Sequence, residues 1–232
     1  MFPIVKMTFV VVLLGLLAGT GRAAEAPAKT VSKITPAMCE MLGMADEYIS
    51  RFNYYNGKPR PGFVEHFYPG ESKLADVYQK LINDYRQESG AKFSCKRKDD
   101  GHVQFGSAVL AGIINSFYKT VDKLATLDIK HLMGADRECR LRYLLGAYRR
   151  YGKDKSNVIS MANAAHKIET IAAVLKKVGC PSAAQYFTET IPTGNYVFFE
   201  PSKEISKLLG VENVIAFSKL AKKYEAKLQK PR

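Results

Sequence analysis

The stretch that decides the fold class is residues 92–105, KFSCKRKDDGHVQF. Apolar residues alternate with polar ones at Phe93 and Cys95 before its Asp-Gly pair, and again at Val103 and Phe105 after it. Such alternation on both sides of an Asp-Gly turn is typical of a β-hairpin. Because helical patterns fill much of the remaining chain, this hairpin predicts a mixed fold. An all-α fold is the alternative if the hairpin does not form.

Helical spacing surrounds the hairpin. Apolar residues recur every three or four positions over 36–55, 72–89 and 107–126, and Gly90 stands where the second of these segments should end. A loop rich in aromatic residues, 51–70, joins the first two segments. We therefore expect three helices in this half of the chain.

The second half of the chain shows a similar order. Its expected elements are helices at 136–151, 163–178, 201–209 and 211–228, and strands at 158–161, 185–190 and 195–200. The order helix, hairpin, helix then occurs at 72–126 and again at 163–209, which leaves an internal duplication open. The sequence thus predicts a helix-rich α+β fold with one or two small antiparallel β-hairpin units packed on helices.

The N-terminal residues have the pattern of a secretory signal peptide. Lys6 precedes an apolar run, and small residues end at Ala23, where cleavage is expected. The run is too short for a retained transmembrane helix, so no membrane span is expected after cleavage. The expected division is a signal peptide at 1–23, a polar leader at 24–33 and one compact domain at 34–232, with sub-units at 34–127 and 135–232 as an option.

The 232 residues include 35 Lys+Arg and 22 Asp+Glu, for a formal charge of +13. Without residues 1–23, 33 basic residues remain against the same 22 acidic ones, so a charge of +11 belongs to the expected domain. With 25% charged and 47% hydrophobic residues, the composition excludes disordered, collagen-like and disulfide-dense miniprotein classes. The basic balance indicates an anionic partner.

Four widely spaced cysteines predict two disulfides, because an even number of cysteines in an exported chain is usually paired. Pairing of Cys39 with Cys95 and of Cys139 with Cys180 is weakly preferred, since it closes the shorter loops. Four buried free thiols are the alternative. No C-x-x-C motif occurs, which argues against a thioredoxin-like redox site and a zinc knuckle.

The densest basic segment is the candidate anion-binding site. Arginine suits phosphate, sulfate or carboxylate groups because its planar fork donates two parallel hydrogen bonds. A solvated helix face is the alternative explanation. The candidate residues are Arg137, Arg140, Arg142, Arg149, Arg150, Lys153 and Lys155.

The aromatic loop at 51–70 is a second candidate, because tyrosine and phenylalanine can stack on a sugar or grip a peptide. The alternative is a long loop fixed to the core by its own aromatic residues. The candidate residues are Tyr54, Tyr55, Phe63, Phe67 and Tyr68.

Standard catalytic signatures are missing from the sequence, and neither a cofactor nor a metal is expected. Asn163, His166 and Glu169 would share one face of a helix, so a hydrolase with an unfamiliar site is one hypothesis. A structural histidine is the alternative for His166.

The sequence favours an exported, periplasmic or extracellular protein that binds an anion without catalysis. The expected partner is an anionic polymer, glycan or lipid headgroup, and export disfavours nucleic acid. A secreted hydrolase built on Asn163, His166 and Glu169 is the alternative.

Overall fold

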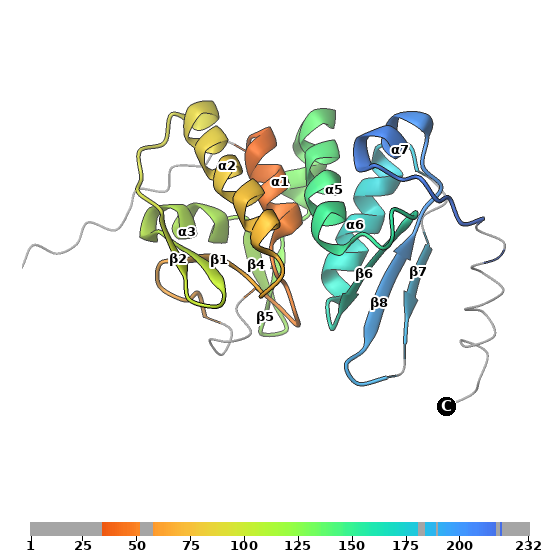
Figure 1. Ribbon diagram of the computed structural model, residues 1–232, viewed down its shortest axis with the longest axis horizontal. Coiled ribbons are helices and arrows are strands. Elements are labelled where there is room, and N and C mark those ends of the chain that lie inside the picture. The colour runs from red at the N-terminus through yellow and green to blue at the C-terminus, as the bar shows by residue number, and fades with distance from the viewer. Residues whose placement is uncertain (1–33, 52–57, 181–183, 189, 217–218, 220–232) are drawn as a thin grey trace, which may run out of the picture. The chain divides into compact units, whose positions relative to one another are not determined.

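The described residues form seven helices and three small antiparallel sheets (Figure 1), so the α+β prediction is confirmed. The structure is a computed structural model that describes residues 34–51, 58–180, 184–188, 190–216 and 219. The first half contains α1 (Pro36–Met44), β1 (Phe63–Phe67), α2 (Ser72–Ser89), β2 (Lys96–Asp99), β3 (Val103–Gly106), α3 (Ala108–Asn115), β4 (Tyr118–Val121), β5 (Leu124–Leu127) and α4 (Lys130–Gly134). The second half contains α5 (Arg137–Tyr151), β6 (Val158–Ala162), α6 (Ala165–Lys177), β7 (Ala184–Phe187), β8 (Gly194–Phe198) and α7 (Lys203–Leu209).

The two halves repeat one order of elements. The order α1-β1-α2-β2-β3-α3 of the first half matches the order α5-β6-α6-β7-β8-α7 of the second. The strand orders also match, β1-β3-β2 in one sheet and β6-β8-β7 in the other. The first half adds the β4–β5 hairpin and α4. The repeat expected from the sequence covers only 72–126 and 163–209. The observed repeat is longer, because it also includes α1 and β1 in the first half and α5 and β6 in the second.

The halves meet where α1 and α5 lie side by side (Figure 1), and two glycines allow the close approach. A Cβ atom at Gly43 would lie 2.1 Å from the carbonyl oxygen of Tyr143. A Cβ atom at Gly146 would lie 2.1 Å from the carbonyl oxygen of Glu40. Because both positions face backbone atoms, which cannot move aside like a flexible side chain, the helix contact depends on glycine.

The helix expected at 36–55 ends at Met44, because side chains from the second half take its last carbonyl groups. Lys167 donates to the carbonyl oxygens of Leu42 and Ala45, and Tyr151 also donates to Ala45. The carbonyl groups that a longer helix would use internally are thus satisfied by other elements.

The helix expected at 107–126 is wrong in its second part. It begins as predicted, since Ser107 caps α3 by accepting a hydrogen bond from the backbone N–H of Leu110, but it ends at Asn115. The chain then forms the β4–β5 hairpin, whose turn has Asp122 and Lys123 at φ 49° and 67°. Two successive residues with positive φ are typical of a tight hairpin turn.

The predicted hairpin at 92–105 is confirmed, although its first strand begins at Lys96. The inner face of the β1–β3–β2 sheet packs on α2. There the rings of Phe67 and Phe105 lie 5.3 and 5.4 Å from the ring of Tyr78. These contacts fix which face of the sheet is turned away from the helices.

The prediction of two disulfides is wrong, because all four cysteines are free thiols. Cys39 and Cys139 lie beside each other across the contact between α1 and α5, and both are buried. A hydrogen bond with Cys139 and burial raise the pKa of the Cys39 thiol well above its usual value. Cys39 and Cys139 therefore pack as small apolar groups in the helix contact.

Several expectations concern residues outside the described ranges. The signal peptide at 1–23, the polar leader at 24–33 and most of the helix at 211–228 belong to this group. The expected start of that helix at Val211 is wrong, because 211–216 are not helical and Asn213 forms a β-bridge with Ser156. No helix in the described part of the chain is long and apolar enough to span a membrane. The division into sub-units at 34–127 and 135–232 stays a prediction.

Candidate functional site

The outer face of the β1–β3–β2 sheet is built from two rows of side chains. Strand pairing places Gly106 between Phe63 and Lys96 in one row. It places Gln104 between His66 and Lys98 in the next row. Because side chains alternate between the two faces of a strand, Arg97 points instead to the inner face, where it pairs with Asp76 of α2 at 2.7 Å.

This outer face is basic and accessible. All four residues of β2 are exposed, and the Lys98 side chain is 71% exposed and forms an ion pair with Asp100, two residues further along the chain. Lys96 has no ion pair among the described residues. The guanidinium of Arg60 lies 5.3 Å from the centre of the Phe63 ring, which adds a cation at the other end of the Lys96 row. The face therefore combines long cationic side chains with Gln104 as a hydrogen-bonding group.

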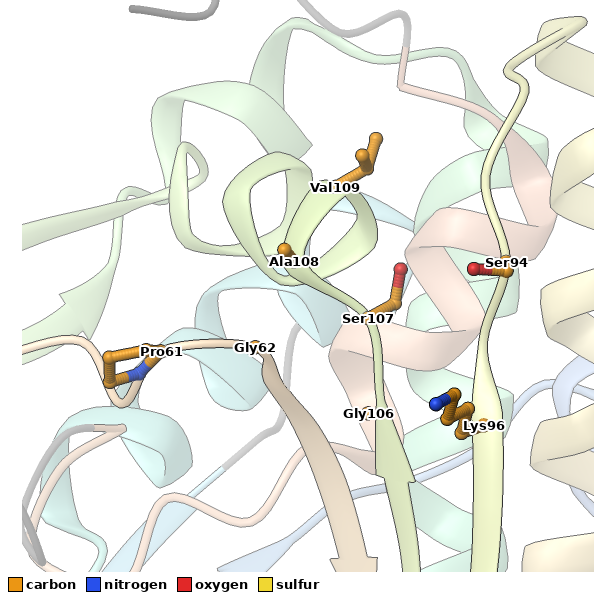
Figure 2. A pocket seen from close by; sticks show the side chains of 8 residues that line it. All are labelled: Pro61, Gly62, Ser94, Lys96, Gly106, Ser107, Ala108 and Val109. Carbon is orange, nitrogen blue, oxygen red and sulfur yellow. The ribbon is translucent and has the colours of Figure 1, made fainter. Parts of the chain in front are cut away.

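A hollow of about 400 Å³ lies at the end of this sheet, where Gly106 leads into α3. Figure 2 shows Lys96 beside Gly106, with the Ser94 and Ser107 side chains close by. Gly106 has no side chain, so the row is open between Phe63 and Lys96. A Cβ atom at Gly106 would have its nearest contact at 3.7 Å, with the carbonyl oxygen of Gly62. The lining residues are Pro61, Gly62, Ser94, Lys96, Gly106, Ser107, Ala108 and Val109.

The corresponding sheet of the second half presents a different face. Its strands β6, β7 and β8 contain no Lys or Arg. Ser160 pairs with Tyr196 on the outer face, and the rings of Tyr196 and Phe198 stack at 6.3 Å with an angle of 10° between their planes. The shared strand order thus carries a basic face in one half and a neutral, partly aromatic face in the other.

A buried ionic network lies where α1 ends and β1 passes α5. Glu65 is fully buried, and its two carboxylate oxygens accept four hydrogen bonds. Oε2 accepts from Arg51 at 2.8 Å and from the backbone of Asp46, and Oε1 accepts from Arg150 at 3.4 Å and from the backbone of His66. Four acceptor positions are about the full capacity of a carboxylate.

Arg150 links this carboxylate to α2. Its side chain is 1% exposed and donates to both carboxylate oxygens of Glu71 at 3.1 Å and to the carbonyl oxygens of Met44 and His66. Burial alone would lower the pKa of Arg150, but Tyr151, Glu65 and Glu71 raise it above the usual value. Arg150 thus stays charged and joins the two halves.

Lys167 of α6 forms the third cationic part of the network. Its ammonium group is completely buried and lies 3.2 Å from Glu47, which also accepts from the hydroxyl of Tyr118. Burial lowers the pKa of Lys167, and the charge of Glu47 opposes this shift. The carboxylates Glu47, Glu65 and Glu71 therefore face the cations Arg51, Arg150 and Lys167, and the formal charges balance.

Most arginines of the basic segment are engaged in ion pairs within the chain, some of them at the surface. Arg142 and Arg149 both pair with buried Glu40, and Arg137 pairs with Glu204 at 2.6 Å. Burial raises the pKa of Glu40, and Arg149 and Arg142 oppose that shift. A role of this segment in binding an anion stays a prediction.

The remaining members of that segment are not gathered at one place. Arg140 donates to backbone carbonyls and Arg150 belongs to the buried network. Lys155 pairs with Glu212 at 2.7 Å, and Lys153 is exposed.

The candidate aromatic residues are divided between the core and the surface. Phe63 and Phe67 belong to β1, and Phe67 is fully buried. Tyr68 is 42% exposed and contacts the ring of His66. Tyr54 and Tyr55 lie outside the described ranges.

The three residues of the hydrolase hypothesis are only partly brought together. His166 and Glu169 lie 3.9 Å apart with exposed side chains. Asn163 precedes α6 and instead binds the hydroxyl of Tyr48 and the backbone of Thr193. None of the three lines the hollow beside the first sheet.

Sequence reasoning missed the buried network, although Lys167 carried a signal. It occupies the apolar stripe of its helix, one position before Ile168 and four before Ile171. A lysine in such a stripe indicates a buried cation with a partner elsewhere in the chain.

No family model and no curated protein matches the sequence. Solved structures do match in fold. The homing endonuclease I-DmoI in complex with DNA and Mn has a TM-score of 0.50 at 11% identity, covering 77% of this chain and 97% of that one. I-DmoI with DNA and Ca has a TM-score of 0.52 at 10% identity, covering 78% and 90%. Mesophilic variants of the same endonuclease have a TM-score of 0.51 at 12% identity, covering 78% and 95%. The chain therefore shares the fold of these proteins.

These comparisons contradict the expected function and location. An exported, periplasmic or extracellular binding protein and a secreted hydrolase are both wrong, because the solved structures that match this fold include the homing endonuclease I-DmoI in complex with DNA. The view that nucleic acid is a disfavoured partner is wrong for the same reason. Net charge alone could not separate DNA phosphates from other anions, so the choice had rested on residues 1–23.

Proposed function

We propose that this chain binds double-stranded DNA through the outer face of its β1–β3–β2 sheet. The observation that carries the proposal is the pair of exposed cations on β2, Lys96 and Lys98, on a fold similar to that of a DNA-bound endonuclease. A strand ribbon fits the major groove of DNA, where lysine and glutamine side chains can reach phosphates and base edges. Lys96, Lys98 and Arg60 contact phosphates in this proposal, and Gln104 faces the groove.

Charge reversal on the sheet tests this function. A labelled mixed-sequence duplex is titrated with the full chain and with the double variant Lys96→Glu and Lys98→Glu, and binding is followed by fluorescence anisotropy. The matched control is Lys203→Glu with Lys207→Glu, which changes the same charge at two exposed positions of α7.

The β2 variant is expected to lose at least about 100-fold in affinity for the duplex. Each Lys→Glu substitution removes a contact with a phosphate and adds a negative charge that the phosphate repels. The α7 variant should stay within a few-fold of the unchanged chain. Equal losses in both variants would mean that only net charge matters, and absence of binding by the unchanged chain would end the proposal.

A further inference from the structure

Two of the matched structures, both of I-DmoI, are complexes with DNA and either Mn or Ca, so we ask whether this chain could hold a divalent metal. Such ions bind carboxylate oxygens, and a site usually combines several of them. Among the described residues, Asp46 and Glu47 after α1, Glu65 of β1 and Glu71 before α2 form one group of carboxylates linked by shared partners. They therefore provide the test of whether the residues fit a metal.

The donor set does not fit. Both oxygens of Glu65 are filled by four donors, two of which are the buried guanidinium groups of Arg51 and Arg150. Glu71 holds Arg150 with both oxygens, and Glu47 holds the ammonium group of Lys167. A metal that lay among these cations would be repelled by them at low dielectric. A metal that displaced them would leave buried cations without partners, which is also costly.

Asp46 is the remaining carboxylate of this region. One oxygen accepts from the backbone of Tyr48, and the other contacts the Tyr68 hydroxyl at 3.2 Å and His66 at 3.5 Å. Within the described ranges, no three His, Cys, Asp or Glu side chains are placed to hold a metal ion.

We infer that the pairing of Glu47, Glu65 and Glu71 with Arg51, Arg150 and Lys167 leaves no divalent-metal site among these carboxylates. The chain then binds DNA without a divalent cation and does not hydrolyse it by a metal-dependent route. The inference rests on the proposed function for its DNA part, and its metal part concerns the free chain. Three buried cations hold these carboxylates together, and two of them, Arg150 and Lys167, belong to the second half.

Manganese binding to the free full-length chain tests the metal part directly. Mn²⁺ is titrated into the protein, and the concentration of free Mn²⁺ is measured by electron paramagnetic resonance. The same titration into EDTA shows the signal expected when the Mn²⁺ is bound. The expected result is no stoichiometric binding and an unchanged thermal unfolding midpoint. One tightly bound Mn²⁺ per chain that is lost in Asp46→Asn or Glu47→Gln would overturn the inference.

Duplex binding in EDTA and in Mn²⁺ tests the DNA part. Affinities within about twofold of each other and intact supercoiled plasmid after incubation with Mn²⁺ support the inference. Mn²⁺-dependent cleavage, or binding at least tenfold tighter with Mn²⁺, would overturn it. Absence of duplex binding under both conditions would overturn the proposed function, and the manganese titration of the free chain would still decide the metal part.

Discussion

The two halves of this chain share one order of elements and one strand order, but they differ in where their charged side chains lie. The β1–β3–β2 sheet presents Lys96 and Lys98 on its outer face, whereas β6, β7 and β8 contain no basic residue. The reverse holds inside the molecule. There the first half supplies the buried carboxylates Glu47 and Glu65, the partly exposed Glu71 and one cation, Arg51. The second half supplies the other two cations, Arg150 and Lys167.

The difference teaches that backbone order constrains the contact between the halves more than it constrains their surfaces. Gly43 of α1 and Gly146 of α5 occupy equivalent helices and make the same kind of contact, since each lies against the backbone of the other helix. The outer faces are free of such a packing requirement, so their charge can diverge. We therefore expect substitutions in the helix contact to affect both halves, and substitutions on one sheet to affect only that sheet.

The largest effect is expected where the halves are alike. Gly146→Ala puts a methyl group 2.1 Å from the carbonyl oxygen of Glu40 and should destabilise the protein by about 4 kcal/mol or prevent folding. Denaturant unfolding followed by circular dichroism measures the change. Gly112→Ala in α3 is the control, because a Cβ atom there meets nothing within 4 Å and alanine favours the helix by about 0.5–1 kcal/mol. Similar stability of both variants would contradict the close helix contact.

The second effect concerns the cations that the second half supplies. Lys167→Met leaves Glu47 buried without its cation and should cost about 3 kcal/mol in the free energy of unfolding. The double variant with Glu47→Gln removes the uncompensated charge and should recover most of that loss. A double-variant cycle with no coupling between the two sites would mean that the pair is not a unit of the network.

A smaller effect separates the first sheet from the exposed surface of the second half. Lys96→Ala should reduce the slope of log affinity against log salt for a DNA duplex by about one, the contribution of a single phosphate contact. Lys207→Ala in α7 serves as the control, and its slope should equal that of the unchanged chain. The contrast between the halves fails if the two slopes change equally.

The smallest effect is a pH dependence at the helix contact. Burial raises the pKa of Glu40 above 4.5, so the folded chain holds a proton on this group more strongly than the unfolded chain. Stability from this group is therefore fully present below pH 4.5 and falls as the pH rises through the folded pKa. As the pH rises from about 4 to 7, the unfolding free energy of Glu40→Gln should thus increase relative to that of the unchanged chain. A constant difference across that range would contradict the assigned shift.

Local signals in the sequence were sufficient for many elements. Asp136 and Gly90 mark the start of α5 and the end of α2, because a cap depends only on neighbouring residues. The α+β class followed from the hairpin around Asp100. Phe117 and Val121 misled, since their spacing fits a helix and they instead belong to a loop and a strand before a tight turn.

Long-range features could not be read from such signals. A glycine inside a helix, such as Gly43, reveals a close contact only when the facing helix is known. The carboxylates of the network were missed because two of their cations, Arg150 for Glu65 and Lys167 for Glu47, lie more than 80 residues away in α5 and α6. The disulfide prediction failed because it followed from the expected export and not from the packing around Cys39 and Cys139.

Amide hydrogen exchange with and without duplex DNA tests the central claim most directly. Measured in EDTA, it reports which of the two sheets is covered and whether binding needs a divalent cation. The account predicts DNA-dependent protection of peptides that contain Phe63, β2 and β3, with no change in β6 or β8. Protection of the second sheet alone, or protection that requires Mn²⁺, would contradict it.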